Sequence, residues 1–476
     1  MNWAEFLTAE EVMQVHEASL SILEETGILV RNENARRIFA RAGCRVESEK
    51  GVVKIPGKVV EAYRKAFPPS FTFRGRDPRY DRTIPEEGPI MITASSAPDI
   101  IDPETGRQRR ATSGDIARIA RLINELPGYD VFSISTLAAD APAGLASVAR
   151  FYPALKYCLK PVRSNTPSMK ELQEVLELGA LIAGGEEAYR ERPLINHHYC
   201  PVVSPLTMDV ESTEAVIHLT GKGLPVYGTI CPNAGMSAPL SLTATLVQGN
   251  AEFLALALLM QMVRSGAPLI YAVLATVADM RTGNYAPGAI ETAMLQIGFS
   301  QMARYYRVPS GGYIGLTNAH VNDAQSGYET GMGTTAGLLG GADMLNMGGL
   351  LGSLMVFDFA KAMIDHEVAM MLKQLRKGIP YRPEELCLGL IHEVGPGGTF
   401  MDQMHTLEKM RTTAYLPKIA TREMGERWEQ GGRTAIGSRG LKEAKRMWAK
   451  KSPALFDAEL DRKIFARFPG LGSLAD

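Results

Sequence analysis

The feature that most constrains the fold is a rhythm of short apolar, β-branched runs, each followed by a helical stretch. Eight such runs occur, at residues 129–136, 160–165, 193–200, 225–231, 268–277, 310–316, 342–348 and 388–395. Strands that alternate with helices in this way are typical of parallel βαβ units, and eight units are the count of a closed (β/α)8 TIM barrel. An open doubly wound sheet is the competing α/β fold. It usually has fewer strands, and no G-x-G-x-x-G follows an early strand here.

The regions on either side of the barrel pattern indicate additional helices. Residues 1–85 are predicted to form N-terminal helices and a hairpin, with Thr8 and Glu11 in a capping box at the first helix and an alternating hairpin over 44–55. Residues 86–417 are predicted to form the barrel, and 418–476 a tail of charged C-terminal helices.

Composition narrows the class of protein. The 476 residues include 51 Lys and Arg against 52 Asp and Glu, so the balance of charge predicts neither a nucleic-acid partner nor a membrane partner. The 5 cysteines are scattered and odd in number, which argues against a disulfide framework and for a reducing compartment. The longest apolar run, at 253–260, is too short to span a bilayer. The chain is therefore expected to be cytoplasmic.

The barrel fold also predicts where chemistry should lie, because active sites of such barrels form at the carboxyl ends of the strands. Polar residues at the predicted strand ends are Asn165, Tyr199, Cys200, Cys231, Asn233, Asp279, Tyr313, Asn318, Asn346 and Glu393. For each of them the alternative is a structural role, as a loop cap or as part of a filled layer inside the barrel.

Two groups of residues suggest ligands. His198 and Cys200 point to one face of their strand, and Cys231 ends the next strand, so the three form a plausible zinc set; the alternative is that the thiols are small buried hydrophobic groups. The glycine-rich turn with Gly397 and Gly398 either holds an anion on its backbone N–H groups or forms a flexible lid.

A third stretch, residues 313–359, is rich in glycine and methionine. Tight packing of a helix on the barrel accounts for the small residues after Thr334. It accounts less well for the polar run before them, which consists of Asn318, His320, Asn322, Asp323 and Gln325.

Several long segments resemble one known family. They include "SPLTMDVESTEAVI", "GLPVYGTICPNAGMSAPLSLTATLVQGNAEFL" and "GAPLIYAVLATVADMRTGNYAPG", and two more at residues 322–351 and 395–417. In these segments the chain resembles the trimethylamine methyltransferase superfamily, in particular its members that lack pyrrolysine and demethylate betaines. The resemblance implies a TIM barrel that moves a methyl group from an amine to the Co(I) of a cobamide, carried by a separate corrinoid protein.

The chain departs from the trimethylamine enzymes because only ordinary residues stand where pyrrolysine is expected. A quaternary ammonium is already cationic and leaves as a neutral amine, so its demethylation needs orientation rather than an acid or a metal. Aromatic faces hold such a cation. The predicted cage is Tyr199, Tyr313 and Phe357, with Glu393 or Asp279 as counter-charge.

A betaine also carries a carboxylate, which needs hydrogen-bond donors. The predicted donors are Asn165, Asn318, His320 and the amides of Gly397 and Gly398. Residues predicted to face the corrinoid are Cys231, Asn233, Asn346, Gly397 and Gly398. No metal ligand set and no tightly bound cofactor are predicted, and no catalytic residue is identified.

Glycine betaine is the first substrate hypothesis, ahead of proline betaine, carnitine and choline, and the chain is expected to form a homo-oligomer. Two other functions remain open. One is a metal-assisted barrel enzyme, such as a zinc-dependent methyltransferase, that uses His198, Cys200 and Cys231; the other is a non-catalytic protein that binds quaternary amines.

Overall fold

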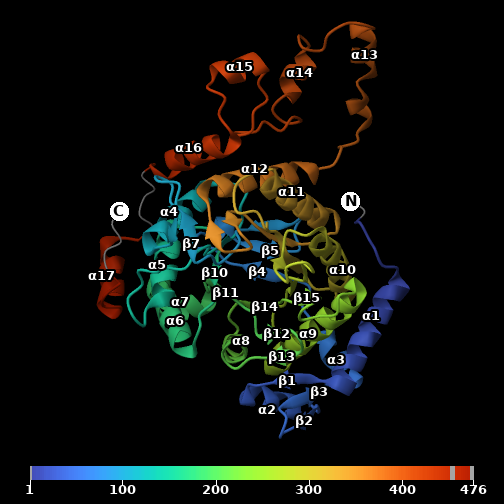
Figure 1. Ribbon diagram of the computed structural model, residues 1–476, viewed down its shortest axis with the longest axis vertical. Helices are drawn as coiled ribbons and strands as arrows, with labels where there is room; N and C mark the ends of the chain where they lie inside the picture. Colours follow the sequence, from blue (N-terminus) through green and yellow to red (C-terminus); the bar gives the residue numbers. More distant parts are fainter. Residues whose placement is uncertain (1–2, 451–455, 472–476) are drawn as a thin grey trace.

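Eight parallel strands form a barrel at the centre of the protein, whose computed structural model describes residues 3–450 and 456–471 (Figure 1). In order around the barrel the strands are β6 (Ile90–Ile92), β9 (Phe132–Ser133), β10 (Val162–Ser164), β11 (Ile195–Tyr199), β14 (Val226–Ile230), β16 (Tyr271–Val273), β19 (Ser310–Gly315) and β20 (Met344–Met347). β20 pairs with β6, and a parallel bridge from Ile92 to Val131 joins β6 to the segment of β9. The predicted (β/α)8 fold is confirmed.

A helix follows every barrel strand and covers the outside of the barrel. These helices are α4 (Ser113–Glu125), α5 (Ala146–Tyr157), α6 (Met169–Ala183), α8 (Glu211–Lys222), α9 (Leu242–Val263), α10 (Ile290–Tyr306), α11 (Ala324–Leu339) and α12 (Phe359–Leu375), and a short α7 (Glu186–Glu191) follows α6. α9 is long and apolar enough to cross a membrane, but 83% of its most apolar window is buried in the protein. It is a core helix, packed against α1 (Ala9–Ser21), α8 and α10.

One predicted strand is wrong and one strand was missed. The run at 388–395 forms a helix, α13 (Leu388–Val394), outside the barrel. The barrel begins instead with β6, a strand of three residues that lies inside the predicted barrel span 86–417 but is not one of the eight predicted runs. Short apolar runs do not distinguish a strand from a helix by periodicity, which explains both errors.

The amino-terminal end of the barrel is closed by a hairpin. Strands β4 (Phe71–Phe73) and β5 (Arg82–Ile84) pair antiparallel. Phe71 and Phe73 are buried and pack in one cluster with Tyr227, Met344 and other side chains of the barrel strands. The hairpin therefore fills the base of the barrel, and access to its interior is left to the opposite end.

The N-terminal region adds a small sheet to the side of the barrel. The capping box of Thr8 and Glu11 and the hairpin of β2 (Arg45–Glu47) and β3 (Val52–Lys54) are confirmed. With β1 (Ile28–Val30) they join two strands from the loop after β11, namely β12 (Val202–Val203) and β13 (Thr207–Met208). Helices α2 (Glu33–Arg41) and α3 (Gly57–Tyr63) complete this region.

The loops at the carboxyl ends of the strands form two further sheets. One contains β7 (Asp99–Ile101), β8 (Gln108–Arg110), β21 (Leu350–Leu351) and β22 (Val356–Phe357). The other contains β15 (Asn233–Ala234), β17 (Thr276–Ala278) and β18 (Tyr285–Ala286). These sheets frame the open end of the barrel.

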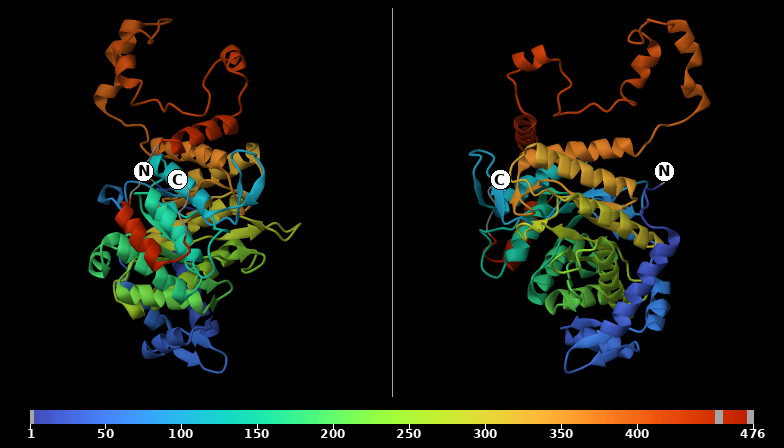
Figure 2. Two further views of the ribbon diagram at one scale, coloured as in Figure 1. Left: turned by 90° about the vertical axis from the view of Figure 1, so that its left-hand side faces the viewer. Right: turned by 45° about the vertical axis from the view of Figure 1, so that its right-hand side comes forward.

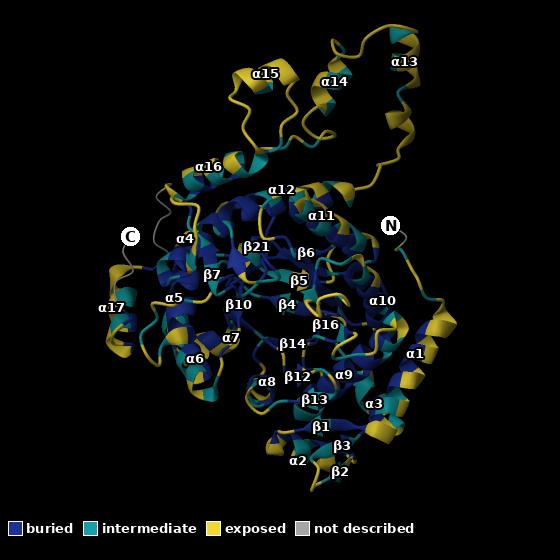
Figure 3. Ribbon diagram, viewed as in Figure 1, coloured by how far each residue is buried: buried dark blue, intermediate teal, exposed yellow. Residues whose placement is uncertain are grey.

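A long arm, residues 374–418, projects from the end of α12 (Figures 1 and 2). It carries α13 and α14 (Met404–Lys409), and the structure describes all of its residues, none of which is buried (Figure 3). Large apolar side chains are exposed along it, and Ile379 reaches 96% exposure. A second excursion contains α15 (Gly425–Gln430), after which α16 (Ile436–Trp448) and α17 (Ala458–Arg467) pack back on the body.

The arm returns to the body at a buried carboxylate on α12. Glu367 accepts hydrogen bonds from the backbone N–H groups of Lys418 (2.6 Å), Ile419 (3.2 Å) and Ala420 (2.8 Å). Replacing Glu367 with Ala leaves these donors unpaired, and we expect a loss of about 1–3 kcal/mol in the stability of this attachment. Amide hydrogen exchange at 418–420 should accelerate at least about tenfold, whereas replacing the exposed Glu423 should leave it unchanged. Unaltered protection in the Glu367 variant would contradict this role.

Candidate functional site

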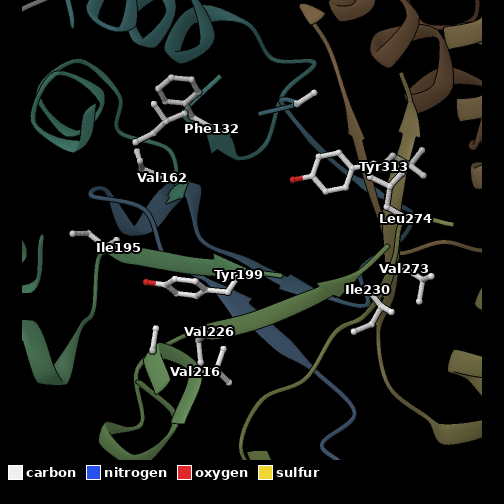
Figure 4. Close-up of a cluster of buried hydrophobic side chains, with 14 of the residues drawn as sticks. Phe132, Val162, Ile195, Tyr199, Val216, Val226, Ile230, Val273, Leu274 and Tyr313 are labelled. Atoms are coloured by element: carbon white, nitrogen blue, oxygen red, sulfur yellow. The ribbon is translucent and has the colours of Figure 1, made fainter. Parts of the chain in front are cut away.

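The interior of the barrel is polar around one buried arginine. Arg163 on β10 donates hydrogen bonds to the hydroxyls of Tyr227 on β14 and of Tyr313 on β19, the latter at 3.0 Å. Its guanidinium carbon lies 5.6 Å from the centroid of each ring. The ring of His198 on β11 lies 4.9 Å from that of Tyr227 and 6.1 Å from that of Tyr313. Figure 4 shows Tyr313 projecting into the space between the strands.

These groups are held in fixed protonation states. Burial lowers the pKa of His198 well below its usual range, and the charge of Arg163 lowers it further. Its Nε2 lies 2.7 Å from the Thr229 hydroxyl. Burial raises the pKa of Tyr227. The imidazole and the phenol are therefore neutral near pH 7, and Arg163 supplies the charge of this cluster.

Two thiols and a tyrosine lie above this cluster, at the open end. Cys200 and Cys231 follow the paired strands β11 and β14 and share a hydrogen bond. That bond lowers the pKa of Cys200, as does the nearby charge of Arg163, while burial opposes the shift. The pKa of Tyr285 is raised by burial and then by the neighbouring Cys231 and Tyr313. Cys200 is exposed and His198 is partly exposed, so solvent enters the barrel at least as far as the imidazole.

This arrangement predicts a selective thiol reaction. Iodoacetamide should modify Cys200 before Cys44 and Cys158, because burial raises the pKa of those two thiols to about 12 and about 11. Replacing Cys231 with Ala removes the hydrogen bond, so the rate at Cys200 near neutral pH should fall about tenfold if its pKa rises by about one unit. Mass spectrometry of peptides reports the order. Modification of Cys158 ahead of Cys200 would contradict the prediction.

Besides His198 and Cys200, five of the residues predicted from the sequence lie inside the open end or at its rim. Tyr313 and Asn346 face the barrel interior, and Asn346 is fully buried with no partner for either amide atom among the described residues. Cys231 lies at the rim, as do half-buried Asn233 on β15 and exposed Asn165 directly after β10.

Two predicted cage residues face away from the interior. Tyr199 lies on the outer side of β11, where its hydroxyl is 2.8 Å from that of Thr166; its ring lies near Val216 and Val226 in Figure 4. Side chains alternate along a strand, so Tyr199 and His198 cannot share a face. Phe357 on β22 is fully buried and packs edge-on against Phe359, 5.3 Å between ring centroids.

Three others form the loops of the open end. Asp279 is paired with Arg281 at 2.7 Å, and hydrogen bonds from Arg281 lower its pKa to about 2, so its charge is already balanced. Asn318 donates to the Tyr285 carbonyl (2.9 Å) and to the Ser353 hydroxyl (2.8 Å), which ties adjacent loops together. His320 is exposed beside Gly352.

The remaining three lie outside the barrel. Glu393 belongs to α13, and Gly397 and Gly398 follow it, all exposed on the arm. They were selected because 388–395 was expected to be the last barrel strand. Since that segment is a helix, the reason for placing them at the site no longer holds.

Sequence reasoning missed Arg163, Tyr227 and Tyr285 as site residues. Selecting residues only at strand ends passed over Arg163 and Tyr227, which lie within strands and face inward. A signal was available: an arginine within the short run "KPVRSN" is unusual for a buried strand.

Exposed apolar side chains surround the open end on the loops that follow four of the strands. These side chains are Met236, Leu240, Met280, Val321 and Met355. Two of them, Met280 and Leu240, pack against Gly235. A Cβ at this position would lie 2.9 Å from the Met280 sulfur and 3.2 Å from Leu240 Cδ1. Among the described residues, no group of three or more His, Cys, Asp or Glu side chains is arranged to hold a metal ion.

Comparison with known proteins gives the family. The profile of the trimethylamine methyltransferase (MTTB) family matches residues 1–467. A trimethylamine methyltransferase of Desulfitobacterium hafniense is 31% identical, covering 91% of this chain and 87% of that protein. A glycine betaine methyltransferase of the same species is 30% identical, covering 97% and 95%. A trimethylamine methyltransferase of Methanosarcina thermophila is 28% identical, covering 89% of each chain. The chain therefore belongs to the trimethylamine methyltransferase family and is a methyltransferase.

Proposed function

We propose that the protein transfers a methyl group from a quaternary amine, with glycine betaine as the first candidate, to the Co(I) of a cobamide carried by a separate corrinoid protein. The relative named for glycine betaine aligns with 97% of this chain. The observation that carries the proposal is the chemistry of the open end. Its rings are neutral, with the pKa of His198 lowered and those of Tyr227 and Tyr285 raised, so none of them is suited to donate a proton near pH 7.

A quaternary amine needs no proton donor. The bond between the methyl carbon and nitrogen breaks with its electron pair left on nitrogen, and the product is a neutral tertiary amine. The cobalt supplies the electron pair of the new bond to carbon. The protein's contribution is orientation: the faces of Tyr313 and Tyr285 hold the cationic head.

The apolar rim fits the approach of a corrin ring. Met236, Leu240 and Met280 are exposed on the loops after β14 and β16, and methionine adapts well to flat apolar surfaces. Cys231 and Asn233 precede Met236 in the same loop and are half-buried. We propose that these residues face the cobamide that the partner protein presents.

The test is methyl transfer to a reduced corrinoid protein, followed by the absorbance of methylcobalt. The substrates are glycine betaine, proline betaine, carnitine, choline and trimethylamine. We expect methylation from at least one quaternary amine and none from trimethylamine. Transfer from trimethylamine alone, or from none of the five, would overturn the proposal.

The cellular setting follows from the same proposal. A cytoplasmic protein without nucleic-acid or membrane partners is supported by 5 free cysteines and a net charge of −1. A homo-oligomer is supported by the exposed apolar side chains of the arm, which short helices such as α13 and α14 do not shield alone. Light scattering of the purified chain tests the oligomer, and a monomer at micromolar concentration would contradict it.

A further inference from the structure

The barrel encloses a cation, Arg163, that has no carboxylate partner in the described part of the chain. Arg163 is 0% exposed, and two of its five N–H groups donate to tyrosine hydroxyls. Its Nε has no hydrogen-bond partner, and no carboxylate lies within 4.0 Å of the guanidinium among residues 3–450 and 456–471. A buried charge without a counter-charge is costly. Buried Arg150 also has no carboxylate partner, but its Nε donates to the Thr136 carbonyl, whereas Arg163 keeps an Nε without a partner among the described residues.

The tyrosines do not neutralise this charge. Burial raises the pKa of Tyr227, so its phenol stays protonated despite the adjacent arginine. Another fully buried cation near the site is treated differently: Lys361 on α12 lies 2.5 Å from the carboxylate of Asp365. Lys361 therefore has a carboxylate partner, whereas Arg163 has none within residues 3–450 and 456–471.

A second unpartnered group lies beside the first. Asn346 on β20 is paired in register with Tyr313, and its buried amide oxygen and amide nitrogen have no partner among the residues that the structure describes. Tyr313 also accepts from Arg163, so the arginine and the asparagine flank one tyrosine inside the barrel. Arg163 Nε and Asn346 Nδ2 are therefore N–H donors beside the same tyrosine that have no partner among the described residues.

We infer that Arg163 and Asn346 bind the carboxylate of a zwitterionic quaternary amine. Guanidinium groups match the geometry of carboxylates, and charge-assisted hydrogen bonds are strong where water is excluded. With the carboxylate at this depth, the ammonium group points toward Tyr285, Cys200 and Cys231 at the open end. The inference rests on the proposed function and adds to it a requirement for an acid group on the substrate, which trimethylamine and choline lack.

Direct binding to the full chain, measured by calorimetry without a corrinoid protein, tests this assignment. The probes are glycine betaine and tetramethylammonium, which share a quaternary head but differ in the carboxylate. Wild-type protein should prefer glycine betaine. Arg163→Met should weaken the binding of glycine betaine by about 100-fold or more, and the affinity for tetramethylammonium should stay unchanged or increase. Arg163→Lys should recover part of the loss, and Asn346→Ala should weaken glycine betaine about tenfold.

The matched control is Arg150→Met, which removes another buried arginine, one that bonds to the Thr136 carbonyl and the Ser164 hydroxyl outside the site. This variant should leave the ratio of the affinities for glycine betaine and tetramethylammonium unchanged. A wild-type protein without preference for glycine betaine, or an Arg163→Met variant that keeps the wild-type ratio, would overturn the assignment. A carboxylate preference that depends on Arg163 but comes without methyl transfer to cobalt would support the assignment and overturn the proposed function alone.

Discussion

Replacing Lys361 with methionine is expected to lower the free energy of unfolding by about 3–5 kcal/mol. Lys361 and Asp365 are both about 1% exposed, and their charged atoms lie 2.5 Å apart. Asp365 also accepts from the N–H of Gly349, and Lys361 donates to the Thr330 hydroxyl. The single substitution leaves a carboxylate in the core without its cation. Because Gly349 lies in the loop after β20, the loss should extend to the open end of the barrel.

Chemical denaturation with urea measures this loss. The double variant Lys361→Met, Asp365→Leu removes both charges and should recover much of the stability, because replacing a whole buried pair is far less costly than breaking it. Lys463→Met is the control: its pair with Glu459 is on the surface, so stability should stay close to wild type. A double variant as unstable as the single one would show that packing, and not charge, is what the lysine supplies.

Acidification from pH 6.5 to 5.5 is expected to remove about 3 kcal/mol of stability through three histidines, about 1 kcal/mol each. Burial lowers the pKa of His197 and of His366 to about 3, and that of His198 well below its usual range. The unfolded chain takes up protons near pH 6.5 and the folded chain does not. The stabilisation is therefore complete above pH 6.5 and declines as the pH falls below it.

Thermal or urea unfolding across this pH range measures how steeply the free energy of unfolding falls with pH. Nδ1 of His366 accepts a hydrogen bond from the Gly128 N–H at 3.2 Å, so this nitrogen must carry no proton and the ring is neutral. A His366→Gln variant keeps an acceptor and should lose about one third of the slope. The control is His392→Gln, since His392 is exposed on α13. If the His366 variant kept the full slope, other groups would have to account for the acid sensitivity.

Most of the fold was accessible from the sequence because the strands follow a regular pattern. Turn residues bound the runs from 129–136 to 342–348, and long helical segments separate them. β6 lacked such a context, with three apolar residues after a proline-rich connector. The run at 388–395 is longer, but its residues form a helix on the arm, and their exposure could not be predicted from composition.

The site was less accessible because its residues come from several strands and face inward. Alternation along β11 correctly placed His198 and Cys200 on one face, next to Cys231, and the same alternation should have excluded Tyr199. Arg163 was passed over because its importance lies in what surrounds it: two hydroxyls and no carboxylate among the described residues. That information exists only in three dimensions.

The hairpin of β4 and β5 has a consequence for the order of events in catalysis. Since Phe71 and Phe73 fill the base in the described part of the chain, the amine and the corrinoid protein of the proposed function would both approach through the open end. Under the proposed function the amine must bind before the corrinoid protein covers the open end. The demethylated product is released only after the corrinoid protein dissociates. Steady-state turnover should then obey a compulsory sequence, with the amine as leading substrate and its product released last.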